Sequence, residues 1–426
     1  MNILVLGSGG REHAMSWLIA KSELCDKLFI APGNAGTQLE GVNLNIKVND
    51  FKAIENAVLT HHIDLVIVGP EDPIVEGIYD YFKSTPNLKD VLIIAPSAQG
   101  AQLEGSKEYA KKFMDRNAIP TAAYASFTAD QYEETKAYLG NQSIPIVIKA
   151  DGLAAGKGVT VAFERKDAEQ AIDDLFLNNK FGEAGSKVVI EEFLDGIELS
   201  VFVLTDGKNY VSLPEAKDYK QIGEGNTGPN TGGMGSISPV PFADQKFMQK
   251  VIDRIIEPTI KGFQKEGIEY RGFVFIGLMN VKGDPYVIEY NVRLGDPETE
   301  AILPRIDEDF VPYLIAAAKG ELTDQKIKIK SAYSATVMLV SGGYPNSYEK
   351  NKEIKGLEKL EANSIFYAGA KQENDKIMTN GGRVLAINSL AANLQEALDQ
   401  SYAKVDKISF DKMYFRKDLG KDLINF

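Results

Sequence analysis

Cysteine and histidine are scarce in this sequence. Cys25 is the one cysteine among 426 residues, and there are three histidines. A single cysteine cannot form an internal disulfide, which excludes a disulfide-held scaffold and fits a reducing compartment, so we expect the cytoplasm. With few histidines, no CxxC pair and no GxSxG motif, the sequence gives no support for zinc chemistry or a nucleophilic triad.

Long hydrophobic runs and an excess of positive charge are lacking as well. The apolar stretches, such as 63–68 and 91–95, are far shorter than the ~20 residues of a membrane helix. Residues 1–7 lack a basic stretch and resemble a buried first strand rather than a signal peptide. Asp and Glu number 60 against 47 Lys and Arg, a net charge of -13. We therefore expect no membrane and no nucleic acid partner.

An ordinary globular composition is present, with a βαβ rhythm at the start. Hydrophobic residues make up 44% and charged residues 25% of the chain, and the length predicts about three domains. Segments of helical spacing at 11–21 and 52–62 separate short runs of Val, Ile and Leu at 3–6, 28–31, 64–68 and 91–95. This alternation predicts a parallel sheet.

From about residue 100, strands follow one another. A helix is expected over 105–117, strands over 146–149, 159–163 and 336–340, and a strand-then-helix unit over 383–404. Turn sequences that favour hairpins occur at Asp195-Gly196, Asp206-Gly207 and Lys282 to Pro285. The middle of the chain therefore predicts an antiparallel sheet, followed by a small C-terminal domain. The expected fold class is α/β and α+β, in several domains.

The first glycine cluster, Gly7 to Gly10, directly follows the first expected strand and begins a helix. It is similar to a dinucleotide-binding fingerprint, but Glu12 stands where a third glycine is required, and no acid follows the second strand to hold a ribose. These departures argue against an NAD site. Two interpretations stay open: a helix N-terminus that binds a phosphate group, and a purely structural tight turn.

A second cluster, Lys149 to Gly158, resembles a P-loop but departs from it. Three residues rather than four separate its glycines, Gly158 follows Lys157 in place of a hydroxyl residue, and a strand follows instead of a helix. We interpret it as a flexible lid over a triphosphate, with lysine charge and backbone N–H groups on the phosphates. Lys149 lies within an apolar strand, where an unpaired ammonium is costly. This favours the lid over an exposed hairpin with solvated lysines.

Two further segments are candidates for binding a nucleotide and a small substrate. The strand that ends in Glu191 and Glu192 can pair with the edge of an adenine, and Glu198 can hold ribose hydroxyls, although an ordinary strand is the alternative. The segment 223–235 is dense in glycine, which is entropically costly to order. We interpret it as a backbone nest around a small polar substrate.

The strand 286–292 carries the sharpest pattern in the sequence. With a period of two, Glu289, Asn291 and Arg293 leave one face while apolar side chains leave the other. A carboxylate and an amide oxygen suit Mg²⁺, which takes its other ligands from water and nucleotide phosphates. Arg293 can bind a carboxylate or phosphate with both arms of its guanidinium. The alternative is a salt-bridged surface strand.

Motifs along the whole chain, taken together, resemble the phosphoribosylamine–glycine ligase family, also called glycinamide ribonucleotide synthetases. They are Gly9-Gly10-Arg11-Glu12-His13, Ala31 to Gly36, Val68-Gly69-Pro70-Glu71, Leu103 to Lys107, Lys149 to Gly158, Glu191 to Gly196, Gly228 to Gly235, Asn291 to Glu298, Asn380 to Arg383 and Phe415 to Asp418. Their order and spacing are specific. The resemblance implies an ATP-grasp enzyme, with two α+β subdomains around ATP behind a parallel-sheet (Rossmann-like) N-terminal domain.

The resemblance implies a reaction and a domain layout. ATP, with Mg²⁺ or Mn²⁺, phosphorylates the carboxylate of glycine, and the amine of 5-phosphoribosylamine attacks the glycyl phosphate to give glycinamide ribonucleotide, ADP and phosphate. The implied domains are an N-terminal α/β domain 1–103, an ATP-grasp region that starts with 104–190 and includes a lid at about 120–190, a core 191–325 with the metal and glycine sites, and a C-terminal domain 326–426. A chain of this kind resembles the monofunctional enzymes, which are usually monomers.

The resemblance also implies roles for individual residues. For ATP it implies Lys107, Lys149, Gly156, Lys157, Gly158, Glu191, Glu192, Leu194 and Glu198, and for the metal Glu289 and Asn291. For glycine, the acyl phosphate and phosphoribosylamine it implies Gly9, Gly10, Gly69, Glu71, Asp218, Asn230, Thr231, Gly232, Gly233, Arg293 and Asp296. The expected catalytic residues are Lys149, Arg293 and Asp296.

Two departures from the family pattern leave questions open. Family members often carry Gln-Asp-His-Lys-Arg where this chain has Lys217-Asp218-Tyr219-Lys220-Gln221, so we assign no ligand role to Tyr219 or Gln221. Met279 stands where many ATP-grasp enzymes have a further acidic ligand, so a second metal would be held mostly by ATP and water. The alternatives are another ATP-grasp ligase or carboxylase, a dinucleotide-dependent oxidoreductase, and a nucleotide-binding regulator without catalysis.

Overall fold

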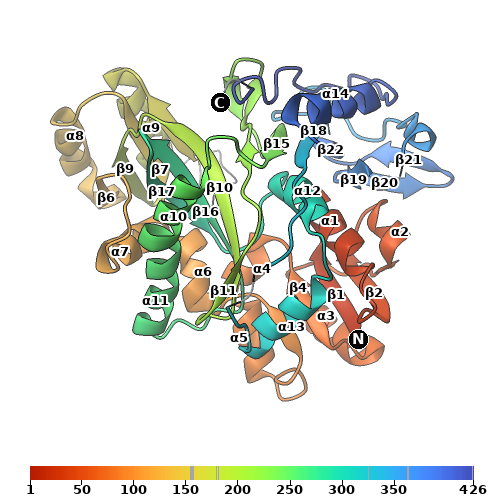
Figure 1. Cartoon of the computed structure of the whole chain (residues 1–426). Coiled ribbons are helices and arrows are strands. Elements are labelled where there is room, and N and C mark those ends of the chain that lie inside the picture. Colours follow the sequence, from red (N-terminus) through yellow and green to blue (C-terminus); the bar gives the residue numbers. More distant parts are fainter. Residues whose placement is uncertain (154–157, 179, 181, 325, 362–363, 425) are drawn as a thin grey trace.

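The computed structural model describes residues 1–426 except 154–157, 179, 181, 325, 362–363 and 425. The described part of the chain contains four sheets of four or five strands and two separate hairpins. Figure 1 shows the N-terminal sheet (red to orange) at the lower right, the C-terminal sheet (blue) above it, and a projecting lobe (yellow to olive) at the upper left. None of the described helices has the length and apolar character needed to cross a membrane.

The N-terminal domain is built on a parallel sheet in the order β3-β2-β1-β4-β5. Its elements are β1 (Asn2–Gly7), β2 (Lys27–Pro32), β3 (Val42–Asn43), β4 (Leu65–Val68), β5 (Leu92–Ile94), α1 (Gly10–Ile19), α2 (Thr37–Glu40), α3 (Phe51–His61), α4 (Glu71–Val75) and α5 (Ile78–Ser84). β1 and β4 are almost wholly apolar and buried, as strands covered on both faces must be. The predicted parallel sheet is confirmed, with β3 as an additional short edge strand.

Two helices lead from this domain to the next sheet. α7 (Lys107–Arg116) confirms the helix expected over 105–117, and α6 (Ala98–Gly105) precedes it. The break falls at Ser106, whose hydroxyl accepts a hydrogen bond from the Tyr109 backbone N–H at 3.1 Å. This N-cap favours the start of a new helix over continuation of α6.

The projecting lobe (residues 124–192) contains an antiparallel sheet in the order β6-β9-β7-β8. Its elements are β6 (Tyr124–Thr128), α8 (Tyr132–Gly140), β7 (Ile146–Ala150), β8 (Val159–Ala162), α9 (Arg165–Phe176) and β9 (Lys187–Glu192). Apolar side chains of its helices and strands form a hydrophobic core of their own. β7 and β8 form the expected hairpin; its tip, residues 154–157, lies outside the described residues.

The central sheet is antiparallel in the order β11-β10-β16-β17. Its strands and the nearby helices are β10 (Ile197–Thr205), β11 (Tyr210–Ser212), β16 (Gly272–Val281), β17 (Asp284–Asn291), α10 (Gln245–Val251), a π-helical segment Ile252–Ile256, α11 (Glu257–Glu266), α12 (Glu298–Ile302) and α13 (Val311–Lys319). The hairpins expected at 206–207 and 282–285 are confirmed.

One expected hairpin was wrong. The turn at Asp195-Gly196 separates β9, which pairs with β6 and β7, from β10, which pairs with β11 and β16. The two strands therefore belong to different sheets, and the turn leads the chain from the projecting lobe to the central sheet. Turn chemistry alone fixes a change of direction, whereas strand pairing depends on what each strand can bury.

The C-terminal sheet takes strands from two distant parts of the chain, in the order β12-β15-β18-β22-β19. Its elements and the associated hairpins are β12 (Lys217–Asp218), β13 (Gln221–Gly223), β14 (Thr227–Asn230), β15 (Gly235–Ser238), β18 (Tyr333–Val340), β19 (Ile365–Tyr367), β20 (Ala370–Glu373), β21 (Lys376–Thr379), β22 (Arg383–Ala391) and α14 (Leu394–Val405). Because β15 pairs with β18, this sheet crosses the boundary that we expect at residues 325/326.

Candidate active site

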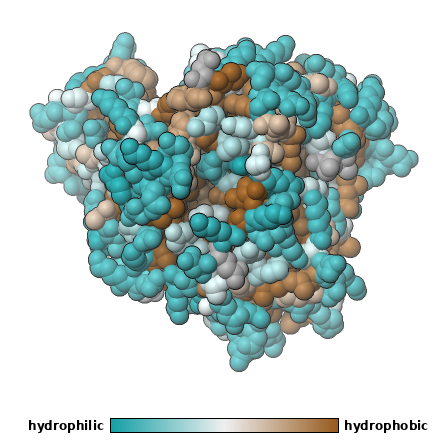
Figure 2. Space-filling view, in the orientation of Figure 1, coloured by the Kyte–Doolittle hydropathy of each residue, from teal (hydrophilic) through white to brown (hydrophobic). Residues whose placement is uncertain are grey.

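Two cavities lie between these domains. The central cavity, of about 470 Å³, is lined by residues of the projecting lobe, the central sheet and the helices α6 and α7. The side cavity, of about 690 Å³, lies between the N-terminal and C-terminal sheets. The outer surface is mainly hydrophilic, and hydrophobic residues show in the hollowed middle of the molecule (Figure 2).

Two buried lysines share one carboxylate in the central cavity. Glu191, near the end of β9, lies 2.8 Å from the Lys111 ammonium and 2.9 Å from the Lys149 ammonium. The three side chains are between 2% and 5% exposed. Burial raises the pKa of Glu191, but the two lysines have a larger effect in the opposite direction, so the pKa lies below its usual value. Two cations and one anion leave a positive charge, which suits an anionic ligand.

A third lysine faces the same space from the start of α7. The Lys107 ammonium donates hydrogen bonds to the backbone carbonyls of Asp151 at 3.3 Å and Gly152 at 3.1 Å. Burial lowers the pKa of Lys107, and the nearby Glu289 carboxylate opposes that shift. Lys107 therefore lies between the hairpin of the projecting lobe and β17, where its carbonyl partners can be exchanged for phosphate oxygens.

Glu289 and Asn291, both on β17, line the central cavity. Burial raises the pKa of Glu289, but nearby lysines, Lys220 above all, lower it more, which favours the ionised carboxylate. Asn291 Oδ1 accepts a hydrogen bond from Arg293 at 3.1 Å, whereas its buried Nδ2 has no partner among the described residues. No cluster of three or more His, Cys, Asp or Glu side chains suits a metal ion in the described chain. Two oxygen donors fit Mg²⁺ or Mn²⁺, which can take its remaining ligands from phosphates and water.

Two carboxylates from the N-terminal helices hold Arg293. Its Nη2 donates to Glu104 of α6 at 2.8 Å and its Nε to Glu71 of α4 at 3.2 Å. Glu104 also accepts a hydrogen bond from the Val292 backbone N–H at 2.8 Å. The Arg293 and Glu104 side chains are 15% and 6% exposed, so little water screens this pair. The contacts fix the end of β17 against the N-terminal domain.

The charge on Glu71 is expected to stabilise the fold at neutral pH and to lose this effect in acid. Burial raises the pKa of Glu71, but Arg293 and Arg11 outweigh it and lower the pKa from 4.5 to about 2. A lowered pKa in the folded state gives a stabilisation that is full above pH 4.5 and falls as the pH drops toward 2. In urea titrations at successive pH values from 6 down to 3, Glu71→Gln should therefore show a shallower acid loss of unfolding free energy than the parent chain. Equal slopes for the two proteins would contradict this linkage.

A cluster of acidic side chains, Glu198, Asp218 and Glu298, lies next to the metal-ligand candidates. The Lys220 ammonium is 2.9 Å from Glu198, and both line the central cavity with Asp218 and Glu298. Burial, and then the charge of Asp218, raise the pKa of Glu298 to about 8. Burial also raises the pKa of Asp218. A positively charged ligand beside Asp218 and Glu298 would favour their ionised forms.

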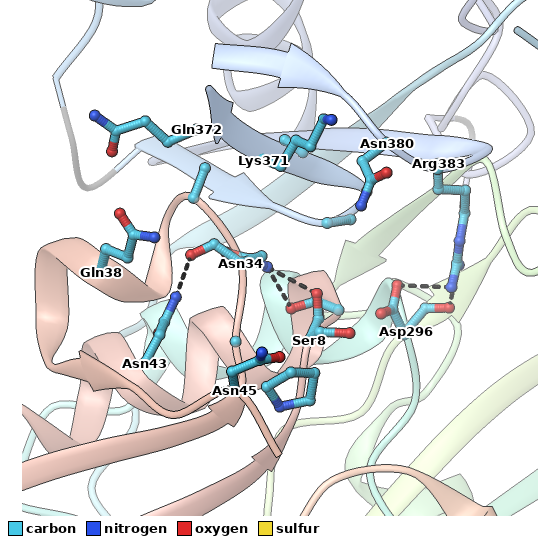
Figure 3. A pocket seen from close by; sticks show the side chains of 18 of the residues that line it. Ser8, Asn34, Gln38, Asn43, Asn45, Asp296, Lys371, Gln372, Asn380 and Arg383 are labelled. Atoms are coloured by element: carbon cyan, nitrogen blue, oxygen red, sulfur yellow. Dashed lines mark hydrogen bonds and ion pairs between the residues drawn. The ribbon is translucent and has the colours of Figure 1, made fainter. Parts of the chain in front are cut away.

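Amide side chains from two domains line the side cavity (Figure 3). Asn34 fixes the N-terminal wall, because its Nδ2 donates to the carbonyls of Ser8 at 2.9 Å and Tyr367 at 2.6 Å. The hairpin of β20 and β21 provides the facing wall (Figure 3). The polar side chains of the cavity are Ser8, Asn34, Gln38, Asn43, Asn45, Asp296, Tyr344, Lys371, Gln372, Asn380 and Arg383. Many neutral donors and acceptors with two cations suit a sugar phosphate.

Asp296 and Arg383 line both cavities. Arg383 Nη2 lies 3.0 Å from Asp296 Oδ1, and its Nη1 donates to the backbone carbonyls of Gly232 and Asp296. Asp296 Oδ2 accepts a hydrogen bond from the Arg11 backbone N–H at 3.3 Å. The ion pair is therefore a wall that the two cavities share.

The protein's own carboxylates occupy the N-terminus of α1. The Gly9 N–H donates to Glu12 at 2.6 Å, and the Arg11 N–H donates to Asp296. Glu12 also fills the space beside Gly69, where an added Cβ would lie 2.1 Å from Glu12 Oε1. These contacts favour the tight-turn interpretation of the first glycine cluster over a phosphate site at this helix end.

Most of the expected site residues come together. The central cavity is lined by Glu71, Lys107, Lys149, Gly158, Glu191, Glu192, Leu194, Glu198, Asp218, Asn230, Thr231, Gly232, Glu289, Asn291, Arg293 and Asp296, and the side cavity by Gly9 and Asp296. Glu71, expected beside phosphoribosylamine with Gly9, thus lies in the other cavity.

Three expected glycines are not among the residues that line either cavity. Gly10, Gly69 and Gly233 instead allow close packing, because an added Cβ would lie 2.2 Å from Glu300, 2.1 Å from Glu12 and 2.4 Å from Pro297 respectively. The space that a Cβ would enter at each of these glycines is filled by other protein atoms, so it is not open to a substrate. Gly156 and Lys157 lie outside the described residues.

Sequence reasoning missed several residues of the central cavity. They are Arg11, Glu104, Lys111, Lys220, Glu298 and Arg383. Lys111 had a usable signal, since it follows Lys107 by four residues and so lies on the same face of α7. Among the amide side chains of the side cavity, Asn34 and Asn380 lie in motifs that carry the family resemblance, whereas the others follow no periodic pattern.

Family models match three consecutive parts of the chain. The phosphoribosylglycinamide synthetase N domain matches residues 1–104, the ATP-grasp (A) domain matches residues 105–299, and the C domain matches residues 334–422. The central cavity lies mainly in the second of these ranges, and the side cavity draws on all three.

Known proteins are similar over the full length of the chain. A phosphoribosylamine–glycine ligase of Salmonella typhi is 45% identical over 426 residues, which cover 99% of this chain and 98% of that protein. A bifunctional purine biosynthetic protein of Pichia angusta is 44% identical, and the match covers 99% of this chain but 53% of that protein. The crystal structure of a phosphoribosylamine–glycine ligase from Thermotoga maritima has a TM-score of 0.85 at 35% identity, covering 98% of this chain and 100% of that one.

Proposed function

Because the chain belongs to the phosphoribosylamine–glycine ligase family, we propose that its two cavities divide the family's reaction between them. The chain is an ATP-dependent ligase of purine biosynthesis that joins glycine to 5-phosphoribosylamine through a glycyl phosphate, releasing glycinamide ribonucleotide, ADP and phosphate. One observation carries the proposal: Asp296 and Arg383 line both cavities. Two reactants held on the two sides of this pair can meet there.

In this proposal ATP lies in the central cavity, beneath the projecting lobe. The backbone from Glu192 to Leu194 pairs with the adenine, and Glu198 binds the ribose. Lys107, Lys149 and Gly158 bind the phosphates, and Gly156 and Lys157 are proposed as further ATP ligands. The support is the positive charge that Lys111 and Lys149 leave after pairing with Glu191.

Glu289 and Asn291 would hold a divalent cation, Mg²⁺ or Mn²⁺, against the phosphates. Both side chains line the cavity and offer the oxygen donors that such ions prefer. When bound, the ion neutralises charge that builds up on the phosphate oxygens. Arg293 orients Asn291 through the 3.1 Å hydrogen bond to its Oδ1.

Glycine would lie between the acidic side chains and the ATP phosphates. Asp218 and Glu298 face its ammonium, while Arg293 and the segment 230–232 hold its carboxylate. The carboxylate oxygen attacks the γ-phosphorus of ATP, so a new P–O bond forms and the bond to ADP breaks. This activation makes the acyl carbon electrophilic, whereas the carbon of a free carboxylate is a poor electrophile. Positioning of this kind can contribute about 7–11 kcal/mol, so the enzyme needs no nucleophile of its own.

Phosphoribosylamine would lie in the side cavity. Lys371 suits its phosphate, the amides of Asn45 and Asn380 suit its hydroxyls, and its amine points toward Asp296 and Arg383. The amine attacks the acyl carbon, so a C–N bond forms and the C–O bond to phosphate breaks. The phosphate leaves with the electron pair, and the nitrogen gives up one proton, which the departing phosphate can accept. The amine and the acyl carbon approach each other beside Asp296 and Arg383, where the two cavities adjoin.

We also propose that the protein is a cytoplasmic monomer that binds neither nucleic acid nor membranes. A net charge of -13 opposes association with polyanions. A single cysteine agrees with a reducing compartment.

Oxygen-18 in the glycine carboxylate is expected to appear in the released phosphate, one label per turnover, because the acyl phosphate leaves with a carboxylate oxygen. ADP formation should require glycine and phosphoribosylamine together, stop when EDTA removes the divalent cation, and resume when Mg²⁺ is restored. Mass spectrometry of the released phosphate measures the transfer of the label, and an assay for ADP measures the dependence on both substrates and on the cation. ADP release that does not depend on both substrates would contradict the substrate assignment and favour another ATP-grasp ligase or carboxylase.

A further inference from the structure

The end of the chain contacts the glycine-rich loop at several points. We call residues 414–422 the tail and residues 217–235 the loop. The Tyr414 hydroxyl donates to the Ile222 carbonyl at 2.9 Å. The Leu419 side chain fills the space beside Gly235, where an added Cβ would lie 2.5 Å from it. The tail thus joins the C-terminal domain to a loop that lies far from it in the sequence.

Arg416 is at the centre of this contact and is 1% exposed. Its Nε and Nη2 bind the two oxygens of Asp418 at 2.8 and 2.7 Å. Its Nη1 donates to the Gln221 carbonyl at 3.1 Å and to Asn226 Oδ1 at 3.0 Å. Asp418 in turn accepts from the Gly225 N–H at 2.7 Å. One forked ion pair therefore holds both the first strand and the turn of the β13–β14 hairpin.

Tyr219 faces the tail as well. Its hydroxyl donates to Asp422 at 2.6 Å and accepts from the Gly420 N–H at 2.9 Å, and the Lys217 ammonium lies 3.0 Å from Asp422. Tyr219 is 2% exposed and is not among the residues that line the central cavity. The departure from the family pattern at this position therefore lies on the side of the loop that meets the tail.

The opposite side of the same loop lines the central cavity. The residues that do so are Asp218, Lys220, Asn230, Thr231 and Gly232. Thr231 closes the base of the hairpin, since its N–H and hydroxyl both donate to the Lys220 carbonyl at 2.7 Å. A segment so rich in glycine has many backbone conformations of similar energy. Its conformation at the cavity therefore depends on contacts from outside, and the tail provides them.

We propose that the tail is a latch that fixes the substrate side of the loop, and that Arg416 is a positioning residue for glycine binding. The inference rests on the proposed function, which places glycine beside this loop. Without the latch, glycine binding must also order the loop, and this cost raises KM for glycine. ATP binding depends mainly on β9, Lys107 and Lys149 and meets the loop through the Lys220–Glu198 ion pair, which is partly exposed, so KM for ATP and kcat should change much less than KM for glycine.

The test is Arg416→Lys in the full-length chain, because lysine keeps the charge but cannot form the fork. KM for glycine is expected to rise about ten-fold, the loss expected for one charge-assisted hydrogen bond, with kcat and KM for ATP within about two-fold of the parent. Amide hydrogen exchange across residues 221–230 should become faster in the same variant. Tyr414→Phe, which removes one exposed contact and does not threaten folding, should shift both readouts in the same direction by less.

Two neighbouring residues are matched controls. Lys417→Met, within the tail, and Lys412→Met, two residues before it, each remove a cation whose contacts are to Phe415 and Glu349 rather than to the loop, and both readouts should stay at the parent values. Unchanged exchange in Arg416→Lys would overturn the latch. Faster exchange with an unchanged KM for glycine would overturn the link to glycine binding, as would an equal loss in kcat and every KM. Failure of the proposed function is separate, because ADP release by the parent chain would then not depend on glycine, whatever the exchange rates are.

Discussion

Glu289→Gln is expected to lower kcat/KM for ATP about 10³-fold while leaving the fold intact. Glutamine keeps the shape of the side chain but removes the one carboxylate of the proposed metal site. The lysines around Glu289 hold it in the ionised form, so the wild-type site has a charge that glutamine cannot supply. Steady-state rates at rising Mg²⁺ concentrations measure the loss, and urea unfolding checks the fold.

A control for this variant lies on the same strand. Asp284 begins β17 and pairs at the surface with Lys250 and Arg254, each at 2.9 Å. Asp284→Asn should keep activity within about two-fold, because exposed ion pairs contribute little. A Glu289→Gln enzyme with more than a tenth of the parent activity would remove Glu289 from the metal site.

Arg293→Ala is expected to lower the free energy of unfolding by about 3–5 kcal/mol, the usual cost of breaking a buried ion pair by removing one partner. Arg293 neutralises Glu104 of α6 and Glu71 of α4. Without it, Glu104 stays in the interior without its ion-pair partner, and Glu71 keeps only the nearby Arg11. The turnover of ATP should be lost as well, because Asn291 loses its donor. Urea titration followed by circular dichroism measures the stability change.

Arg254→Ala provides the comparison for stability. Its side chain is 42% exposed and pairs with the exposed Asp284, so the expected loss is below about 1 kcal/mol. If Arg293→Ala costs no more than Arg254→Ala, then Arg293 is not what joins β17 to the N-terminal domain.

The parts of the fold that the sequence predicted are those set by local patterns. The apolar runs at 3–6 and 64–68 became β1 and β4, because strands buried on both faces need continuous hydrophobic residues. Pairing between distant strands could not be predicted in the same way. β15 joins β18 across some hundred residues, and the turn at Asp195-Gly196 connects two sheets, since each depends on which surfaces meet in space.

The candidate site was predictable where its residues share one strand and hidden where they do not. Glu289, Asn291 and Arg293 follow from a period of two, although a bulge beside Ile288 turns the Ile288 carbonyl toward Lys149 at 3.3 Å. The partners of Arg293 come from elements about 190 and 220 residues away, and no local pattern marks them. The side cavity likewise exists only after two domains have packed together.

The position of Asp296 and Arg383 also sets the distance between the reactive glycyl phosphate and the attacking amine in the proposed arrangement. The two side chains belong to both cavities, so in the proposed arrangement the amine can reach the acyl carbon while the intermediate stays where it formed. An activated acyl group that is consumed on the spot has little time to react with water. In the proposed arrangement, the position of this ion pair therefore limits hydrolysis, which would waste one ATP for each event.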